Sequence, residues 1–86
     1  MKHYIIMIKS YNIDEAGDDI LEDAAVSAVK HTHEEAMAGV KHIADEYAED
    51  GYVVQEDDVH ETDGVLIAPN VDMPSYYINV YVQEIN

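Results

Sequence analysis

Histidines and carboxylates are the residues of this 86-residue chain whose types and spacing could support chemistry, and metal binding is the first chemistry to consider. The run His31-Thr32-His33 resembles a set of metal ligands. However, His33 and His42 lie about two and a half turns apart on one expected helix, so they face nearly opposite sides and cannot share an ion. A solvated helix start accounts for His31 and His33 equally well. We favour this interpretation and predict neither a metal nor another cofactor.

Acidic residues around Gly17 raise calcium as a second possibility. Aligning Gly17 with the sixth position of a helix-loop-helix calcium site places Asn12, Asp14 and Asp23 at the first, third and twelfth positions. The fifth position, which should supply an oxygen ligand, is then Ala16, and no helical pattern precedes the loop. An acidic surface loop is therefore the interpretation that we prefer.

Catalysis finds little support in the sequence. Carboxylate pairs occur throughout the chain, so they single out no general acid and base. Cys is absent, and Ser10, Ser27 and Ser75 have no neighbouring motif that would make one of them a nucleophile. No phosphate loop or dinucleotide motif occurs. We predict that the protein is not an enzyme.

The charge balance is the outlying property of the composition. The chain has 19 Asp and Glu against four Lys and no Arg, which gives a net charge of -15. A surface of this kind repels nucleic acid and anionic membranes. Because 48% of the residues are hydrophobic, we expect one folded domain over residues 1–86 rather than a disordered chain. The opening apolar run, Tyr4 to Ile8, is too short for a signal peptide or a membrane span, so we expect a cytoplasmic protein.

The segment from Thr32 to Gly51 carries the clearest helix signals. Thr32 and Glu35 form a capping box, in which the Thr32 hydroxyl accepts from the Glu35 amide and the Glu35 carboxylate reaches back to the Thr32 amide. Gly51 suits the left-handed position that ends a helix. Apolar residues recur along one face at helical spacing, at Ala36, Val40, Ile43, Ala44 and Tyr47. The range is therefore predicted to be one amphipathic helix.

Strands are expected on both sides of this helix. Residues 2–13 alternate with apolar side chains on both faces, as is typical of a central strand. Residues 14–23 hold six acids and are expected to form a loop. The pattern of residues 24–31 suits either a strand or a helix. We favour a strand, because a helix there would leave the sheet with fewer partners.

The chain after Gly51 reads as three further strands. They are predicted over residues 52–60, 65–68 and 76–85, with prolines bracketing a loop before the last one. In the last strand, Tyr76, Ile78, Val80 and Val82 are expected to face the helix. Together the elements predict an α+β domain with two layers, in which one main helix packs on a mostly antiparallel sheet of about four strands.

Three groups of carboxylates hold 15 of the 19 acids. The first group lies in the expected loop and comprises Asp14, Glu15, Asp18, Asp19, Glu22 and Asp23. The second group lies at the helix end and comprises Asp45, Glu46, Glu49 and Asp50. The third group lies on the following strand and turn and comprises Glu56, Asp57, Asp58, Glu61 and Asp63. We expect the second and third groups to be close in space, and the helix dipole disfavours acids at the second, which suggests that they are used in binding.

The face of the sheet away from the helix is the other candidate surface. Tyr77 and Tyr81, with Tyr11 or Met7 nearby, are expected to form an aromatic patch there. Such a patch is either wetted by its hydroxyl groups or covered by a second copy or a partner. A homodimer is therefore possible. The high acid count has a competing explanation as well, namely a salt-adapted or simply soluble surface.

The whole chain resembles the small acidic proteins of bacteriophages and mobile elements, including anti-CRISPR proteins and DNA mimics. The features that carry this resemblance are the size, the charge, the opening strand KHYIIMIK, the helix entry THEEAM and the closing strand YYINVYVQEI. The resemblance implies a stoichiometric inhibitor of a nucleic-acid-binding defence enzyme in the cytoplasm of a host cell. It supplies no functional residues.

We therefore predict a non-enzymatic protein whose acidic surface occupies a basic, nucleic-acid-binding groove on a protein partner. The predicted partner-binding residues are the whole second and third groups together with Asp14, Asp18 and Asp19. A small structural or housekeeping domain that self-associates through the tyrosine-lined face is the alternative.

Overall fold

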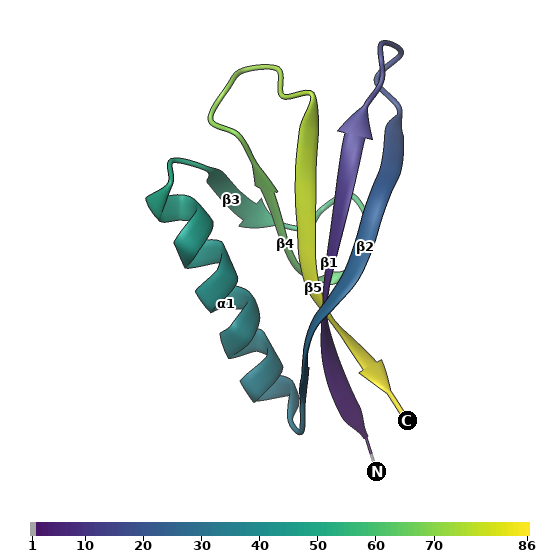
Figure 1. Cartoon of the computed structure of the whole chain (residues 1–86), viewed down its shortest axis with the longest axis vertical. Coiled ribbons are helices and arrows are strands. Elements are labelled where there is room, and N and C mark those ends of the chain that lie inside the picture. The colour runs from purple at the N-terminus through teal and green to yellow at the C-terminus, as the bar shows by residue number, and fades with distance from the viewer. Residues whose placement is uncertain (1) are drawn as a thin grey trace.

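A computed structural model describes residues 2–86 and contains one helix and a five-stranded antiparallel sheet (Figure 1). The elements in chain order are β1 (His3–Ile13), β2 (Asp19–Lys30), α1 (His33–Glu49), β3 (Val53–Glu56), β4 (Asp63–Ala68) and β5 (Tyr76–Ile85). The strand order in the sheet is β2-β1-β5-β4-β3. The α+β prediction is confirmed, with five strands rather than about four.

The helix begins and ends where its local signals place it. Thr32 has an extended backbone, and its hydroxyl accepts a hydrogen bond of 3.1 Å from the Glu35 amide. The reciprocal bond from the Glu35 carboxylate does not occur among residues 2–86, so half of the predicted capping box is formed. At the other end Gly51 adopts a φ of 92°, and its amide donates to the Ala48 carbonyl. A side chain at this φ would be strained, which explains the glycine.

Strand β1 occupies the interior of the sheet, as its two apolar faces predict. It pairs with β2 on one side and with β5 on the other, each time antiparallel. The prediction of a strand over residues 24–31 is also confirmed, because β2 extends to Lys30. No helix formed by residues 2–86 has the length and apolar character needed to cross a membrane.

Strand β2 starts earlier than expected, so the prediction of a loop over residues 14–23 is wrong for its second half. Leu21 pairs with Tyr11 and Asp19 pairs with Ile13, which continues the ladder past two irregularities in the register. The loop shrinks to residues 14–18, where Asp14 Oδ1 accepts from the amides of Ala16 and Asp18 at 2.9 and 2.8 Å. Cross-strand pairing therefore outweighs the low strand propensity of the acids.

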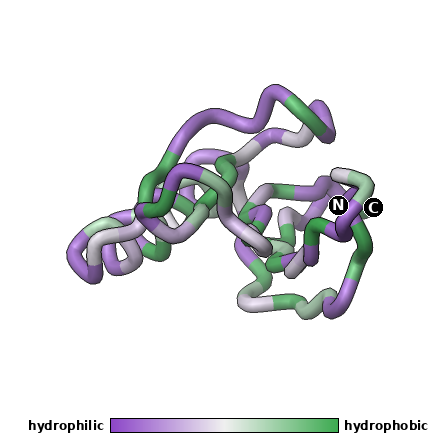
Figure 2. The backbone as a smooth tube through the Cα atoms, turned by 90° about the horizontal axis from the view of Figure 1, so that it is seen from above, coloured by the Kyte–Doolittle hydropathy of each residue, from purple (hydrophilic) through white to green (hydrophobic). Residues whose placement is uncertain are grey.

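The hydrophobic core lies between α1 and one face of the sheet. Small helix residues allow a close approach, and at Gly39 an added Cβ would collide with Ile6 Cδ1 of β1. The buried cluster comprises Ile6, Ala36, Val40, Ala44, Ile67, Val80 and Val82. The helix-facing side of β5 is thus as predicted for Val80 and Val82. Seen from above, the helix stands to one side of the strands, and hydrophobic and hydrophilic segments alternate along them (Figure 2).

Candidate partner-binding surface

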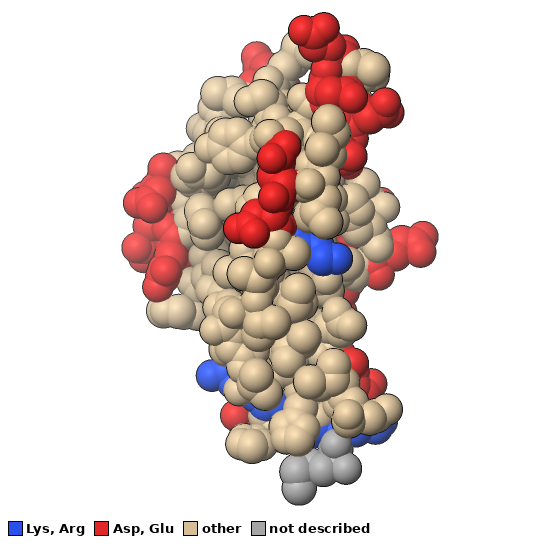
Figure 3. All heavy atoms as spheres, turned by 45° about the vertical axis from the view of Figure 1, so that its right-hand side comes forward, with Lys and Arg blue, Asp and Glu red and all other residues tan. Residues whose placement is uncertain are grey.

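Carboxylates occupy several separate patches rather than one continuous surface. In the space-filling view most of them gather over the upper half of the molecule, with few lysines between them (Figure 3). The first group lies on the β1–β2 hairpin, the second at the end of α1, and the third on β3, the loop after it and the start of β4.

The first group divides into residues that build the hairpin and residues that face solvent. Asp14 holds the tight loop through the hydrogen bonds that it accepts from the amides of Ala16 and Asp18. Asp19 points to the face of the sheet away from α1, where its Oδ2 accepts a 2.7 Å hydrogen bond from the Tyr77 hydroxyl. Its side chain is only partly exposed. Asp18 is exposed, and within residues 2–86 its carboxylate has no hydrogen-bonded partner, so it is free to meet an external cation.

The second group contains two internally paired acids and two free ones. Asp45 binds Lys41 Nζ at 2.9 Å, and Glu46 lies 2.8 Å from His42 Nε2, each one helical turn away. Such exposed pairs contribute little to stability. Glu49 and Asp50 have no ion-pair partner among the described residues, and the last helical turn contains no basic residue. The negative end of the helix therefore projects uncompensated charge.

Asp57 of the third group organises the loop in which it lies. Its Oδ1 accepts from the amides of Val59 and His60, both at 2.9 Å, and its Oδ2 accepts from the amide and the hydroxyl of Thr62. Burial alone would raise the pKa of this carboxyl, but the hydrogen bonds outweigh burial and lower the pKa to about 2. The residue is thus a structural anion, and β3 ends at Glu56 rather than running on to residue 60 as predicted.

The same loop, residues 57–62, is fastened onto the face of the sheet away from α1. The buried Asn79 of β5 donates through Nδ2 to the Thr62 hydroxyl at 3.1 Å. His60 stacks on Tyr11 with ring centroids 4.6 Å apart, and its Nε2 lies 2.5 Å from the Tyr77 hydroxyl. The loop therefore folds toward the hairpin of the first group. These contacts join the loop to the sheet and not to the end of α1, so the expected proximity of the second and third groups stays a prediction.

The tyrosines expected to line an open face are covered instead. Tyr77 and Tyr81 are only 8% and 7% exposed. Their predicted neighbours are confirmed, since Tyr11 stacks on Tyr77 at 5.1 Å and Met7 is paired with Tyr81 in the β1–β5 register. Burial and the hydrogen bond to Asp19 raise the pKa of Tyr77. The prediction of an open aromatic patch is wrong, because His60 of loop 57–62 contacts Tyr77 and the Lys9 ammonium lies 5.5 Å from the centroid of the Tyr81 ring.

The histidines considered as metal ligands have different neighbours. The His3 and His31 rings lie 6.0 Å apart, whereas the His33 imidazole contacts the Asp63 carboxylate, and His42 faces its own helix neighbour. Among residues 2–86 no group of three or more His, Asp or Glu side chains is arranged to hold a metal ion.

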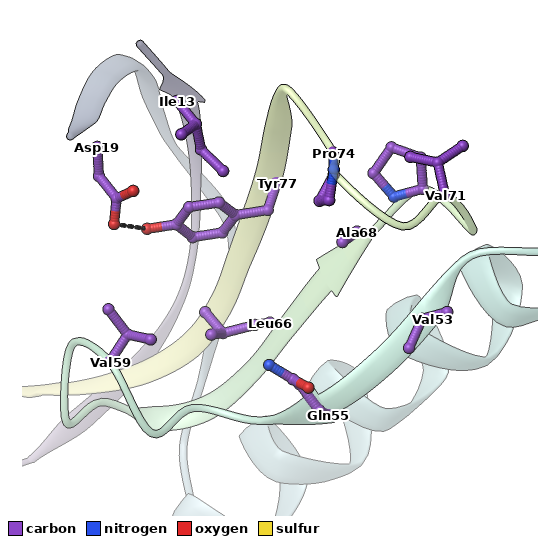
Figure 4. A pocket seen from close by; sticks show the side chains of 11 residues that line it. Ile13, Asp19, Val53, Gln55, Val59, Leu66, Ala68, Val71, Pro74 and Tyr77 are labelled. Atoms are coloured by element: carbon purple, nitrogen blue, oxygen red, sulfur yellow. Dashed lines mark hydrogen bonds between the residues drawn. The ribbon is translucent and has the colours of Figure 1, made fainter. Parts of the chain in front are cut away.

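An apolar groove of about 390 Å³ opens on the face of the sheet away from the helix (Figure 4). Leu66 and Tyr77 form its floor, and Figure 4 shows the Asp19 carboxylate hydrogen-bonded to Tyr77 at one end. The β1–β2 hairpin, loop 57–62 and the loop between β4 and β5 form its rim. The remaining lining residues are Ile13, Val53, Gln55, Val59, Ala68, Pro69, Val71 and Pro74. Sequence reasoning missed this groove.

The loop that shapes the groove left only a partial signal in the sequence. Asp residues often form turns by accepting hydrogen bonds from the backbone amides two and three residues further along the chain. Asp57 could therefore have been recognised as a residue that organises a loop. The stacking of His60 on Tyr11 has no local signal.

No family model, no curated protein and no solved structure matches this chain.

Proposed function

We propose that the protein is a non-enzymatic binder whose free surface carboxylates engage a basic surface of a protein partner. The supporting observation is uncompensated charge at the end of α1 and at the end of β3, where Glu49, Asp50 and Glu56 are exposed with no ion-pair partner among the described residues. Lysines that could neutralise them are few in a chain of net charge -15. Asp18 in the β1–β2 hairpin and Asp58 in loop 57–62 add further exposed charge.

The partner that fits this surface is a nucleic-acid-binding protein. Duplex DNA presents about one phosphate charge per 1.7 Å of helix axis, and a groove of Lys and Arg built for that density accepts dense carboxylates as well. The binder would then exclude nucleic acid from the groove. The resemblance to small acidic inhibitors of phages and mobile elements supports the finer proposal that the partner is a defence enzyme of a host cell, met in the cytoplasm.

A charge-neutralised variant tests this proposal. The substitutions Glu49→Gln, Asp50→Asn, Glu56→Gln and Asp58→Asn remove free carboxylates and leave every internal ion pair described above intact. Asp57 is kept, because its neutralisation would release the loop. A basic partner would first be captured from host lysate at low salt, and its affinity for both forms would then be measured over a range of salt concentrations.

The expected result is a loss of affinity of about tenfold or more with a shallower salt dependence, because fewer charges are screened. Duplex DNA should compete with the wild-type protein for the partner. A matched control is Lys41→Gln with Asp45→Asn, which removes one cation and one anion and should leave affinity nearly unchanged. Equal affinity of wild type and the four-substitution variant would refute the proposal.

The second candidate function is that of a structural domain that self-associates. The surface for this would be the edge of the sheet and not the tyrosine-lined face. The tyrosine face is covered, but Leu21, Val26 and Val29 of the edge strand β2 are exposed apolar residues. Exposed edge strands of this kind can pair with another chain. Sedimentation at several protein concentrations would detect such a dimer. A purely salt-adapted surface predicts instead that the monomer unfolds at low salt and gains stability as salt rises.

A further inference from the structure

The groove away from the helix gathers apolar side chains that are left in water. Val53, Val59 and Val71 are 48%, 56% and 59% exposed, and they come from three different segments. Single exposed apolar residues are ordinary, but several around one concave site mark a place where another molecule binds.

Charge around the groove narrows what can bind there. Asp19 at the groove end keeps one carboxylate oxygen, Oδ1, without a hydrogen-bond donor from residues 2–86, because Tyr77 donates to Oδ2 only. Asp58 and Asp72 directly neighbour the lining residues Val59 and Val71 in the chain. No Lys lines the groove. The site thus joins an apolar floor to the Asp19 carboxylate at one end (Figure 4), and two further acids lie next to the lining residues in the chain.

The apolar floor and the carboxylates around the groove favour one class of ligand over the others. A second copy of this chain would bring another charge of -15 to an already anionic rim. A neutral apolar molecule would fill the floor and leave the rim unused. An anionic lipid or nucleotide would be repelled. A segment with apolar side chains between cationic ones satisfies both parts of the site.

We propose that this groove seats apolar side chains of a basic segment of the protein partner, while Asp19 and the neighbouring rim carboxylates receive the flanking Lys or Arg residues. This inference rests on the proposed function and specifies its partner: the basic surface carries an apolar anchor. General charge attraction brings the partner to the domain, and the groove fixes where it binds.

Two synthetic peptides of equal length and charge test the anchor with the full-length protein. In one, lysines alternate with leucines; in the other, the same lysines alternate with serines. Fluorescence anisotropy should show the lysine–leucine peptide binding about tenfold or more tighter, the factor expected for burial of one apolar side chain. Ala68→Leu, which fills the groove, should remove this advantage and leave the lysine–serine peptide unaffected.

A second variant guards against misfolding of the first. Val71→Ser changes an exposed loop residue, so it should leave thermal stability unchanged and still reduce the advantage of the leucine peptide severalfold. Amide chemical shifts in the presence of the leucine peptide should move at Leu66, Ala68 and Tyr77.

Other outcomes overturn the inference in distinguishable ways. Equal binding of both peptides, sensitive to the four-substitution variant, would support the charged surface and refute the anchor. Binding of the neutral dye Nile red as tight as that of the leucine peptide would assign the groove to uncharged apolar ligands. Groove shifts that appear on concentration of the protein alone would assign it to a second copy. Binding of neither peptide would count against both proposals.

Discussion

On one face of the sheet, Ile6, Ile67 and Val80 meet the small residues of α1 in a dry core; on the other face, Leu66 and Tyr77 meet two loops around an open groove. The first contact is made by regular elements and apolar atoms alone. The second depends on hydrogen bonds that Asp57 accepts and on those made by the side chains of His60 and Asn79, and it leaves apolar surface uncovered. The same strands therefore form a closed core with one face and the floor of an open groove with the other.

The sharpest test of this difference uses two neighbours in β4 that point to opposite faces. Ile67→Ala should lower the free energy of unfolding by about 3–4 kcal/mol, because it empties a closed core. Leu66→Ala should cost about half as much, since Leu66 already borders an open space. Urea unfolding measures both. Equal losses would mean that the groove face is packed as tightly as the core.

Loop 57–62 provides the next largest expected effect. Asp57→Ala should destabilise the domain by about 1–2 kcal/mol, because four donors lose their acceptor. Asp58→Ala, its exposed neighbour, should change stability by only a few tenths of a kcal/mol. If the two variants were equally stable, the loop would not be held by the Asp57 carboxylate.

The pH dependence of the Asp57 effect has a definite sign. Because its pKa is lowered from 3.8 to about 2 in the folded protein, the carboxylate stabilises the fold fully above its unfolded pKa. This contribution is lost as pH falls from about 4 through about 2. The stability difference between wild type and Asp57→Ala should therefore shrink over that interval in acid titrations followed by circular dichroism.

Tyr77 gives a smaller effect at neutral pH and a larger one in alkali. Tyr77→Phe removes the hydroxyl that contacts Asp19 and His60 and should cost about 1 kcal/mol. Because burial and Asp19 raise the pKa of Tyr77 above 10.0, the folded form loses stability as pH rises past that value. The variant should lose less in alkali. Tyr76→Phe, whose hydroxyl contacts only Tyr52 at 3.2 Å, is the matched control.

The helix end should yield the smallest change, in the opposite direction. Glu49→Lys places a cation at the negative end of the helix dipole, where basic residues are absent from the last turn. It should raise the melting temperature slightly, by a gain of about 0.3–1 kcal/mol. The same substitution should weaken partner binding. A variant that gained stability and kept full affinity would remove Glu49 from the binding surface.

The sequence predicts the helix and the core face well because their signals are local and periodic. The Thr32 cap, the glycine at position 51 and the alternation in β5 each act within a few residues. The position of β1 in the interior of the sheet follows from its two apolar faces. These parts of the fold could be derived without knowledge of any distant contact.

The groove could not be derived in this way, because distant residues make it. His60 meets Tyr11 of β1 and Tyr77 of β5, and Asp19 of the hairpin accepts a hydrogen bond from Tyr77. Composition also gives no means to distinguish acids that form hydrogen bonds within the domain from acids that face solvent. Asp57 and Glu49 look alike in a charge count, yet one fastens a loop and the other faces solvent.

The pairing of β1 with β5 has a consequence for how the protein reaches this structure. The first and last strands meet over ten residue pairs at the centre of the sheet, so the core cannot close until nearly the whole chain is available. Loop closure over such a separation slows folding relative to proteins with local contacts. During synthesis the β1–β2 hairpin and α1 would form before β5 is available, and the domain would be completed in one late step once β5 can pair with β1.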